Sequence, residues 1–447
     1  MAGHSKYYRP IQYLGSKIRI VDTIVKECQK LYTPENYVLD LFSGSSIVAQ
    51  SLYNNGMNVI ANDAMSFSSD IAACMLNQDR KKCSISNVEA FVSGMVSLHT
   101  LPQNFMEFSS LIDKERQLLD KKDLLGLKVL YDNLSQVGSD RQASLQVDYI
   151  RKHAGCSAIN NYPLFANYYA GTYFGIRQAL EIDVLRNAIE TEWNQMCDLW
   201  ERKVLLTALY NTCSIIVHSV GKHFAQPIQI NGQENKITNT RLFENRNYNV
   251  FDVFKTCIMN IIGSIAKNDI NSTSYSLCMD ICSPTFRKLI ADKNVDVIYA
   301  DPPYTAQQYS RFYHIPEVLH SYKYPRLQMF RGKYTQGIYP EGKYKSPFCS
   351  KIKAKGAFEF IFDMAQNHDC SLIVSYSESK KEKTGNERMV TLEYLLQLAR
   401  KKLPHHSLSI INFDFDYRQL NRSDKIVENK DDKEILLIFK KQLYKDI

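Results

Sequence analysis

A regular alternation of short apolar segments, turns and helical patterns near the N-terminus constrains the fold most. Residues 37–42 (Tyr-Val-Leu-Asp-Leu-Phe) have the composition of a short buried strand, and a turn of small residues follows at 43–46. A helical pattern then covers 47–54, and a second apolar strand covers 57–61. A strand, a turn, a helix and a further strand in this order begin a doubly wound α/β domain. We therefore predict a Rossmann-like α/β sheet flanked by helices.

The strand pattern stops in the first third of the chain and returns only in the last third. Segments 105–137 and 178–220 carry apolar residues at helical spacing. Further apolar segments of strand length occur at 275–279, 295–300, 371–375, 406–413 and 434–439. We expect one discontinuous sheet domain, residues 1–75 and 271–447, which a large and mainly helical insertion, residues 76–270, interrupts.

Neither the N-terminus nor the cysteines suggest an exported or metal-stabilised protein. The first ten residues lack the apolar core of a signal peptide, and no apolar run approaches the ~20 residues of a membrane span. The 11 cysteines are scattered without a C-x-x-C pair, which disfavours a zinc site and a disulfide framework. We expect a cytoplasmic protein that has no membrane partner.

Positive charge is concentrated in one stretch, residues 323–355. The whole chain has a net charge of +8, and this stretch alone holds nine Lys or Arg residues against one acid, Glu341. Aromatic residues are interleaved with the basic ones, and rings can stack on bases while cations neutralise phosphates. The candidate DNA-contacting residues are Lys333, Lys343, Lys345, Lys351, Lys353 and Lys355. An ordinary solvated surface loop is the alternative.

Two acids and a glycine follow the first two predicted strands. Asp40 lies at the end of the first strand and Gly44 in the turn after it, where a glycine lets the backbone approach a ligand closely. Asp63 follows the second strand, a position that suits hydrogen bonding to ribose hydroxyls. Alternatively, Asn62 and Asp63 only cap the next helix. Because phosphate-loop spacings are absent, a nucleoside-type ligand without a triphosphate fits best.

The sequence Asp301-Pro302-Pro303-Tyr304 directly follows the apolar segment 295–300. Neither proline can donate to a strand ladder, so the strand must end in a stiff loop. The Asp301 carboxylate and the Pro302 carbonyl can each accept an N–H from one exocyclic amine, which frees the nitrogen lone pair for attack on a methyl group. The Tyr304 ring can stack on a base taken out of a duplex. The alternative is a rigid turn with an aspartate cap.

Together these motifs resemble the Dam-type family of adenine-specific DNA methyltransferases, which use S-adenosylmethionine. The resemblance covers roughly residues 11–75 and 275–440. The matching pieces, in order, are Tyr13-x-Gly15-Ser16-Lys17, Asp40-Leu-Phe-Ser-Gly44, Asn62-Asp63, Met279-Asp280 and Asp301-Pro-Pro-Tyr304. The resemblance implies a methyltransferase sheet in the discontinuous domain, with the helical insertion as the target-recognition domain and the basic stretch within the catalytic part.

The resemblance also implies a role for each matching residue in cofactor binding. Tyr13 and Lys17 would lie near the methionine end, where Lys17 would neutralise the carboxylate. Asp40 belongs to the loop motif, in which Phe42 and Gly44 would lie beneath the cofactor. Asp63 would bind ribose, and Asp280 and Ile281 would flank the adenine. The product would be S-adenosylhomocysteine, and no metal is required because the sulfonium supplies the electrophile.

At the reacting end, Asp301 and Pro302 would hold the target amine, Pro303 would stiffen the loop, and Tyr304 would stack on the target base. One residue departs from the family pattern, because Ser46 stands where members usually carry a second glycine. A serine is strained at a position that requires a positive φ.

The expected function is methylation of the adenine N6 amine in double-stranded DNA, within a restriction–modification or phage-defence system. A cognate restriction endonuclease or defence-system subunits would then be partners. Within the insertion, residues 167–174 and 221–227 are candidates for reading sequence, while the basic stretch grips the backbone. Methylation of cytosine N4, RNA adenine or a protein amide remains open, as does a non-catalytic nucleic-acid-binding protein that keeps the fold.

Overall fold

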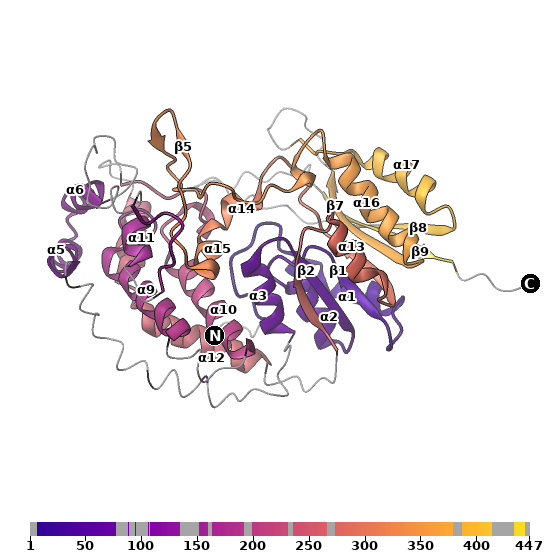
Figure 1. Cartoon of the computed structure of the whole chain (residues 1–447), viewed down its shortest axis with the longest axis horizontal. Helices are drawn as coiled ribbons and strands as arrows, with labels where there is room; N and C mark the ends of the chain where they lie inside the picture. Colours follow the sequence, from indigo (N-terminus) through magenta and orange to yellow (C-terminus); the bar gives the residue numbers. More distant parts are fainter. Residues whose placement is uncertain are drawn as a thin grey trace, which may run out of the picture.

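The computed structural model arranges the chain as a sheet half and a helical half that lie side by side (Figure 1). The N-terminal and C-terminal segments together build the sheet half, and the middle of the chain builds most of the helical half. The structure describes residues 7–76, 88, 94, 106, 108–134, 152–159, 163–191, 199–230, 236–265, 273–378, 387–413 and 433–442.

A seven-stranded sheet has the order β3-β2-β1-β4-β7-β9-β8. Its strands are β1 (Tyr37–Asp40), β2 (Asn58–Asp63), β3 (Tyr275–Cys278), β4 (Val295–Ala300), β7 (Ser371–Glu378), β8 (His406–Phe413) and β9 (Lys433–Lys441). The neighbours from β3 to β7 pair in parallel, whereas β9 is antiparallel to both β7 and β8. All seven predicted strands are therefore present, and the Rossmann-like α/β fold is confirmed.

Helices cover both faces of the centre of this sheet because the central strands are apolar on both sides. Val38 packs with α1 (Val21–Gln29) and α2 (Ile47–Asn54) on one face. Leu39, the next residue, packs on the other face. That face is covered by α13 (Pro284–Ala291), α16 (Ala354–Asn367) and α17 (Leu392–Lys402). This double coverage explains why the strands have continuous apolar sequences rather than alternating ones.

The strand order reverses between β1 and β4, which are hydrogen-bonded neighbours in the centre of the sheet. In open α/β sheets, ligands bind beyond the carboxyl ends of the strands at such a reversal. Asp40 is the last residue of β1, Asp63 is the last of β2, and Asp301 directly follows β4. The topology thus brings three acids that lie far apart in the sequence to one edge of the sheet.

The helical half consists of consecutive helices that pack around their own core. They are α3 (Ser66–Met75), at the border with the sheet, then α5 (Ser109–Asp120), α6 (Leu124–Leu134), α8 (Leu164–Tyr168), α9 (Ile176–Thr191), α10 (Leu199–Ile216), α11 (Lys236–Asn247) and α12 (Val250–Ile265). The described part of the predicted helical segment 105–137 contains α5 and α6, and the chain turns between them at Lys122, which has a φ of 52°. Residues 135–137 lie outside the described residues. Segment 178–220 likewise contains α9 and α10.

The segment after the Asp301 loop crosses to the helical half. Its elements are α14 (Tyr309–Phe312), α15 (His314–Ser321), a hairpin of β5 (Met329–Phe330) and β6 (Lys333–Tyr334), and the short helix η6 (Pro347–Cys349). Ile315, Leu319 and Tyr322 belong to the core of the helical half. The backbone N–H of Tyr324 donates to the Cys156 carbonyl at 3.0 Å. Part of the basic stretch therefore packs against the insertion. The division into domains stays a prediction.

No helix in the described part of the chain is long and apolar enough to cross a membrane.

Candidate active site

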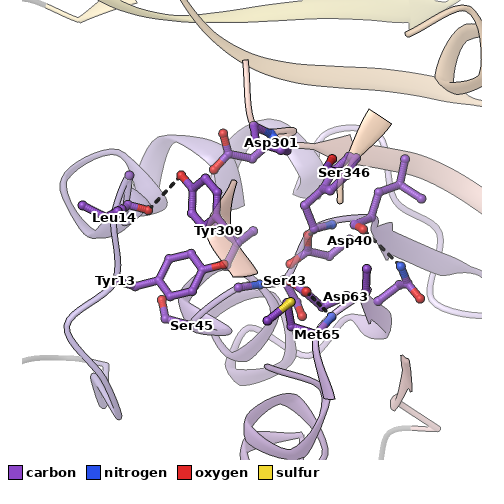
Figure 2. Close-up of a pocket in the computed structure, with 18 of the residues that line it drawn as sticks. Tyr13, Leu14, Asp40, Ser43, Ser45, Asp63, Met65, Asp301, Tyr309 and Ser346 are labelled. Carbon is purple, nitrogen blue, oxygen red and sulfur yellow. Dashed lines mark hydrogen bonds between the residues drawn. The ribbon is translucent and has the colours of Figure 1, made fainter. Parts of the chain in front are cut away.

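A cavity of about 870 Å³ lies where the carboxyl ends of β1, β2 and β4 meet (Figure 2). Of the residues predicted for the site, the cavity wall contains Tyr13, Lys17, Asp40, Phe42, Gly44, Asp63, Ile281, Asp301 and Pro303. The wall does not include Pro302, Tyr304 or Asp280.

The loop after β1 requires a glycine at position 44 for two reasons. Gly44 has a φ of 50°, and a Cβ built there would lie 2.7 Å from Cε1 of the Tyr13 ring. Side chains do not tolerate so short a contact, and L-residues rarely adopt that φ. The Gly44 N–H also donates to Asp63 Oδ2 at 2.9 Å, which ties the loop to the end of β2. The Tyr13 ring thus lies against the glycine, and the close approach of a ligand to this loop stays a prediction.

Asp63 is buried and bonded to backbone on both sides. Besides accepting from Gly44, its Oδ1 accepts the N–H of Met65, the residue before α3, at 2.8 Å. Burial raises the pKa of Asp63 to about 6, although these backbone N–H groups favour the ionised form. Asp63 therefore shapes the cavity wall and the approach to α3. Each of its oxygens has a further lone pair, and ribose binding stays a prediction.

Ser46, the residue that departs from the family pattern, has a left-handed backbone conformation. Its φ and ψ are 61° and 17°, and it directly precedes α2. Its Oγ is buried and has no hydrogen-bond partner among the described residues. The backbone of Ser46 is therefore strained, because a residue other than glycine occupies the left-handed region.

Two tyrosines that the sequence analysis missed hold the N-terminal segment against the cavity. The Tyr13 ring stacks on the Tyr313 ring at a centroid distance of 4.6 Å and an angle of 8°. The N–H of Leu14 donates to Tyr313 Oη at 2.7 Å. Tyr309 Oη donates to the Leu14 carbonyl at 3.2 Å (Figure 2). Tyr309 and Tyr313 are four residues apart and directly follow the Asp301 loop. Residues at this spacing lie on one side of a helix, and that pattern is the signal in the sequence that could have identified the pair.

Lys17 and Asp301, which were predicted to serve different ligands, contact each other. Lys17 Nζ lies 2.9 Å from Asp301 Oδ2, 2.9 Å from Glu434 Oε1 and 3.0 Å from the Gly15 carbonyl oxygen. Burial would lower the pKa of Lys17, but the two carboxylates outweigh this effect and raise it. Burial raises the pKa of Asp301 to about 6 even though Lys17 stabilises its ionised form. Nothing in the local sequence pointed to Glu434.

Several buried polar atoms in the cavity wall have no hydrogen-bond partner among the described residues. Asp40 is 1% exposed; its Oδ1 accepts the Phe42 N–H at 3.3 Å, while Oδ2 has no partner. Burial raises the pKa of Asp40 to about 8. Three other atoms of wall residues are also buried without a hydrogen-bond partner among the described residues, namely Ser16 Oγ, Ser43 Oγ and Asn62 Oδ1. Because native proteins rarely leave buried polar groups unpaired, this wall fits a polar ligand.

Apolar and aromatic side chains also line the cavity. Phe42 packs edge-on against Phe348 at a centroid distance of 5.1 Å, and Ile281 is 3% exposed. Asp280, next to Ile281, accepts the Cys282 N–H at 2.9 Å and lies outside the wall. Tyr344 from the basic stretch does line the cavity. The arrangement suits a flat aromatic ring, although the adenine-flanking roles of Asp280 and Ile281 stay predictions.

The Tyr304 ring lies beside the cavity and carries an arginine on one face. The Cζ atom of Arg388 is 5.0 Å from the ring centroid, and the Tyr304 carbonyl accepts the Met389 N–H at 2.9 Å. Arg388 itself donates through Nε to the Ser377 carbonyl at 2.5 Å. The Tyr376 ring also contacts Tyr304, at a centroid distance of 5.7 Å. A base stacked on Tyr304 would therefore have to fit beside both neighbours or displace one of them. Sequence reasoning did not find Arg388, and base stacking by Tyr304 stays a prediction.

The candidate DNA-contacting lysines are mostly on the surface. Lys343 is half-buried and donates to Gln328 Oε1 at 2.8 Å. The exposed ones are Lys333, Lys345, Lys351, Lys353 and Lys355. Among the aromatic residues of the stretch, Phe330 is 67% exposed, whereas Tyr324, Tyr339 and Phe348 are buried.

The insertion segment 167–174, one candidate for reading bases, lies in the core of the helical half. Asn167, Tyr168, Tyr173 and Phe174 are all buried. The side chains of this segment are therefore packed against protein, and the DNA interface proposed below does not include them.

Residues 13–261 match the D12 class N6 adenine-specific DNA methyltransferase family, just over half of the 447 residues. The match includes the loop at 40–46 and most of the helical half, and it ends before Asp301. Two modification enzymes are also similar to parts of the chain. Modification methylase LlaI of Lactococcus lactis subsp. lactis is 29% identical over 156 residues, which are 35% of this chain and 22% of that enzyme.

Type II methyltransferase M.FokI of Planomicrobium okeanokoites is 23% identical over 369 residues, 82% of this chain and 44% of that enzyme. A match of this extent passes the end of the family match and takes in residues 301–304. The chain spans less than half the length of both relatives. With the family match over more than half of its residues, the chain belongs to the D12 class N6 adenine-specific DNA methyltransferase family.

Proposed function

We propose that this protein transfers a methyl group from S-adenosylmethionine to the N6 amine of adenine in double-stranded DNA, as the modification enzyme of a restriction–modification system. Family membership and the names of the two relatives support the reaction and the setting. One observation carries the proposal. The carboxylate of Asp301, held by a proline-stiffened loop, stands in the wall of the cavity at the switch point of the sheet.

The charge of the cavity fits this cofactor. Its wall contains Asp63 and Asp301, whose pKa values of about 6 leave them mainly ionised at neutral pH, and one ammonium, Lys17. The Asp40 carboxyl, with a pKa of about 8, is mainly protonated there. S-adenosylmethionine carries a sulfonium and an ammonium against a single carboxylate, so its net charge is complementary to the wall, whereas a triphosphate would be repelled. The unpartnered Asp40 Oδ2 is a buried acceptor that a cationic ligand would satisfy. When bound, the cofactor supplies an electrophilic methyl group.

The chain's own residues prepare the amine. The Asp301 carboxylate accepts one N–H and the Pro302 carbonyl accepts the other, which leaves the nitrogen lone pair free. With a pKa of about 6, Asp301 is mainly ionised at neutral pH and can take the proton that the amine loses. Tyr309 and Tyr313 fix the segment that carries Tyr13 and Lys17, which would hold the methionine end. Gly44 and Phe42 form the floor beneath the cofactor.

DNA would lie along the basic stretch. Exposed lysines neutralise phosphates without reading sequence. The β5–β6 hairpin projects from the helical half (Figure 1), turning at Arg331 and Gly332, which both have positive φ, as tight hairpins require. Phe330, beside this turn, is exposed in a way that suits contact with a base or a sugar. A cognate restriction endonuclease or defence-system subunits would be the protein partners of this enzyme.

A direct assay tests the function. The purified protein is incubated with methyl-labelled S-adenosylmethionine and, separately, with duplex DNA, RNA and total protein, and the modified product is digested and identified. The proposal expects N6-methyladenine from duplex DNA, and none from the Asp301→Asn variant. Label in N4-methylcytosine, in RNA or in protein would replace the proposed substrate. Absence of transfer by a protein that binds DNA would favour the non-catalytic alternative.

A further inference from the structure

Glu434, an acid at the far end of the sequence, is buried at the active site. It lies at the start of β9, opposite Ser377 of β7 and Phe413 of β8. Because β9 runs antiparallel to both neighbours, its first residues reach the edge where β1, β2 and β4 end. The side chain is 7% exposed, and its Oε1 lies 2.9 Å from Lys17 Nζ. A buried carboxylate is costly unless a charge compensates it.

Among the described residues, Glu434 and Asp301 form ion pairs with the same cation, Lys17. Lys17 is 5% exposed, and each carboxylate approaches its Nζ to 2.9 Å. The Glu434 contact lacks hydrogen-bond alignment, since its Oε1 accepts no hydrogen bond from the described residues. Glu434 therefore acts on Lys17 chiefly through its charge. Two negative charges against one positive charge leave the group with an excess of negative charge beside the loop at 301–304.

We propose that Glu434 is a positioning residue for methyl transfer, which draws Lys17 away from an exclusive pair with Asp301 and so keeps the Asp301 carboxylate a strong acceptor for the target amine. The inference rests on the proposed function. A lone Lys17–Asp301 pair would bind the carboxylate tightly and weaken it as an acceptor. With Glu434 competing for the same cation, Asp301 retains more of its negative charge for the substrate.

Other groups also face Asp301 and remain unchanged when Glu434 is altered. Lys17 comes from the N-terminal segment, Asp40 from the end of β1, and Tyr13 and Tyr299 carry hydroxyls whose pKa values the Asp301 charge helps to raise. Glu434 adds to the effect of burial in raising the pKa of Asp301. Removing the Glu434 charge should thus lower the pKa of Asp301, by about one unit for a neighbouring charge.

The test compares Glu434→Gln, which removes the charge and keeps the shape, with Asp369→Asn. Asp369 lies in the turn between α16 and β7 and pairs with Lys441, at the other end of β9, at 2.6 Å, so the control makes an acid-to-amide change in an ion pair at the opposite end of that strand. The Asp301 carboxyl is titrated by ¹³C NMR in protein labelled at aspartate side chains, and its signal is identified by loss in Asp301→Asn. Single-turnover methyl transfer is measured over the same pH range.

We expect the Asp301 titration and the acid limb of the rate to move together to lower pH, by about one unit in Glu434→Gln and not in Asp369→Asn. An unchanged Asp301 midpoint in folded Glu434→Gln would overturn the inference. If that variant does not fold, Glu434→Asp replaces it, because the shorter side chain keeps the charge but moves it away from Lys17. This variant should show a smaller downward shift of the Asp301 midpoint. A midpoint equal to that of wild type would overturn the inference. The titration needs no substrate. A shifted midpoint in a protein that methylates nothing would therefore reject the proposed function and leave the charge coupling intact.

Discussion

Replacing Ser46 by glycine should stabilise the protein, although most substitutions in a buried loop destabilise it. Ser46 occupies the left-handed region at a φ of 61°, which costs an L-residue roughly 1–2 kcal/mol. Its buried Oγ lacks a partner among the described residues, and an unsatisfied hydroxyl costs about 1–3 kcal/mol. Against this, glycine gains about 0.4–1 kcal/mol of conformational freedom in the unfolded chain. The net gain in the free energy of unfolding is about 1–5 kcal/mol.

Two further variants separate the contributions. Ser46→Ala removes the hydroxyl but keeps the strained backbone, so its stability should lie between wild type and Ser46→Gly. Ser45→Gly makes the same exchange one residue earlier, where φ is not positive, and should destabilise by about 0.4–1 kcal/mol. The same substitution at adjacent positions should thus have opposite signs.

The assay is thermal unfolding of the four proteins in one buffer. An unfolding entropy of about 2.1 cal/mol/K per residue over 447 residues makes 1 kcal/mol worth roughly 1 °C. Ser46→Gly should therefore melt about 1–5 °C above wild type. A melting temperature at or below that of wild type, or one below that of Ser46→Ala, would refute the backbone-strain argument.

Three other substitutions give further predictions. Gly44→Ala places a Cβ 2.7 Å from the Tyr13 ring at a φ of 50°, so we expect S-adenosylmethionine to bind about tenfold more weakly or worse, by calorimetry; unchanged affinity would contradict the role of this loop. The pKa of Asp40 is raised to about 8, so its stabilising contribution is present at low pH and lost as pH rises toward 8. The melting temperature of Asp40→Asn relative to wild type should therefore increase by roughly 1 °C per pH unit between pH 5 and 8, and a flat difference would argue against a buried, unpaired carboxylate. Replacing the exposed lysines at 351, 353 and 355 by glutamine should reduce the salt-dependence slope of DNA binding by up to about 2.7, while the methylated sequence stays the same; a changed sequence would show that these residues read bases.

The sequence predicted the sheet well because its signals are local. Each buried strand is an apolar run bounded by a turn, and the proline pair at 302 and 303 ends β4 where expected. The loop at Gly44 was also predictable from the sequence, since its positive φ and the lack of room for a Cβ atom restrict that position to glycine. In contrast, β5 and β6 have two residues each, too short for any periodicity.

The remaining features depend on long-range packing. Lys17 and Glu434 lie almost a whole chain apart, and only the reversal of β9 brings them together. Likewise, the aromatic residues of the basic stretch looked alike in sequence, but Tyr324 became core while Phe330 stayed exposed. The alternation of basic and aromatic residues in the sequence did not show which rings would be buried. Their burial depends on the surface of the insertion against which they pack.

The central claim is that Asp301 holds the target amine, and the single-turnover rate of methyl transfer to duplex DNA by Asp301→Ala tests it most directly. Both prolines remain in this variant, and Lys17 keeps Glu434 as a partner, so the fold should persist with an unchanged thermal transition. Loss of one preorganised acceptor should lower the rate by about 10²–10³-fold or more. A rate within twofold of wild type, from a folded variant, would contradict the account.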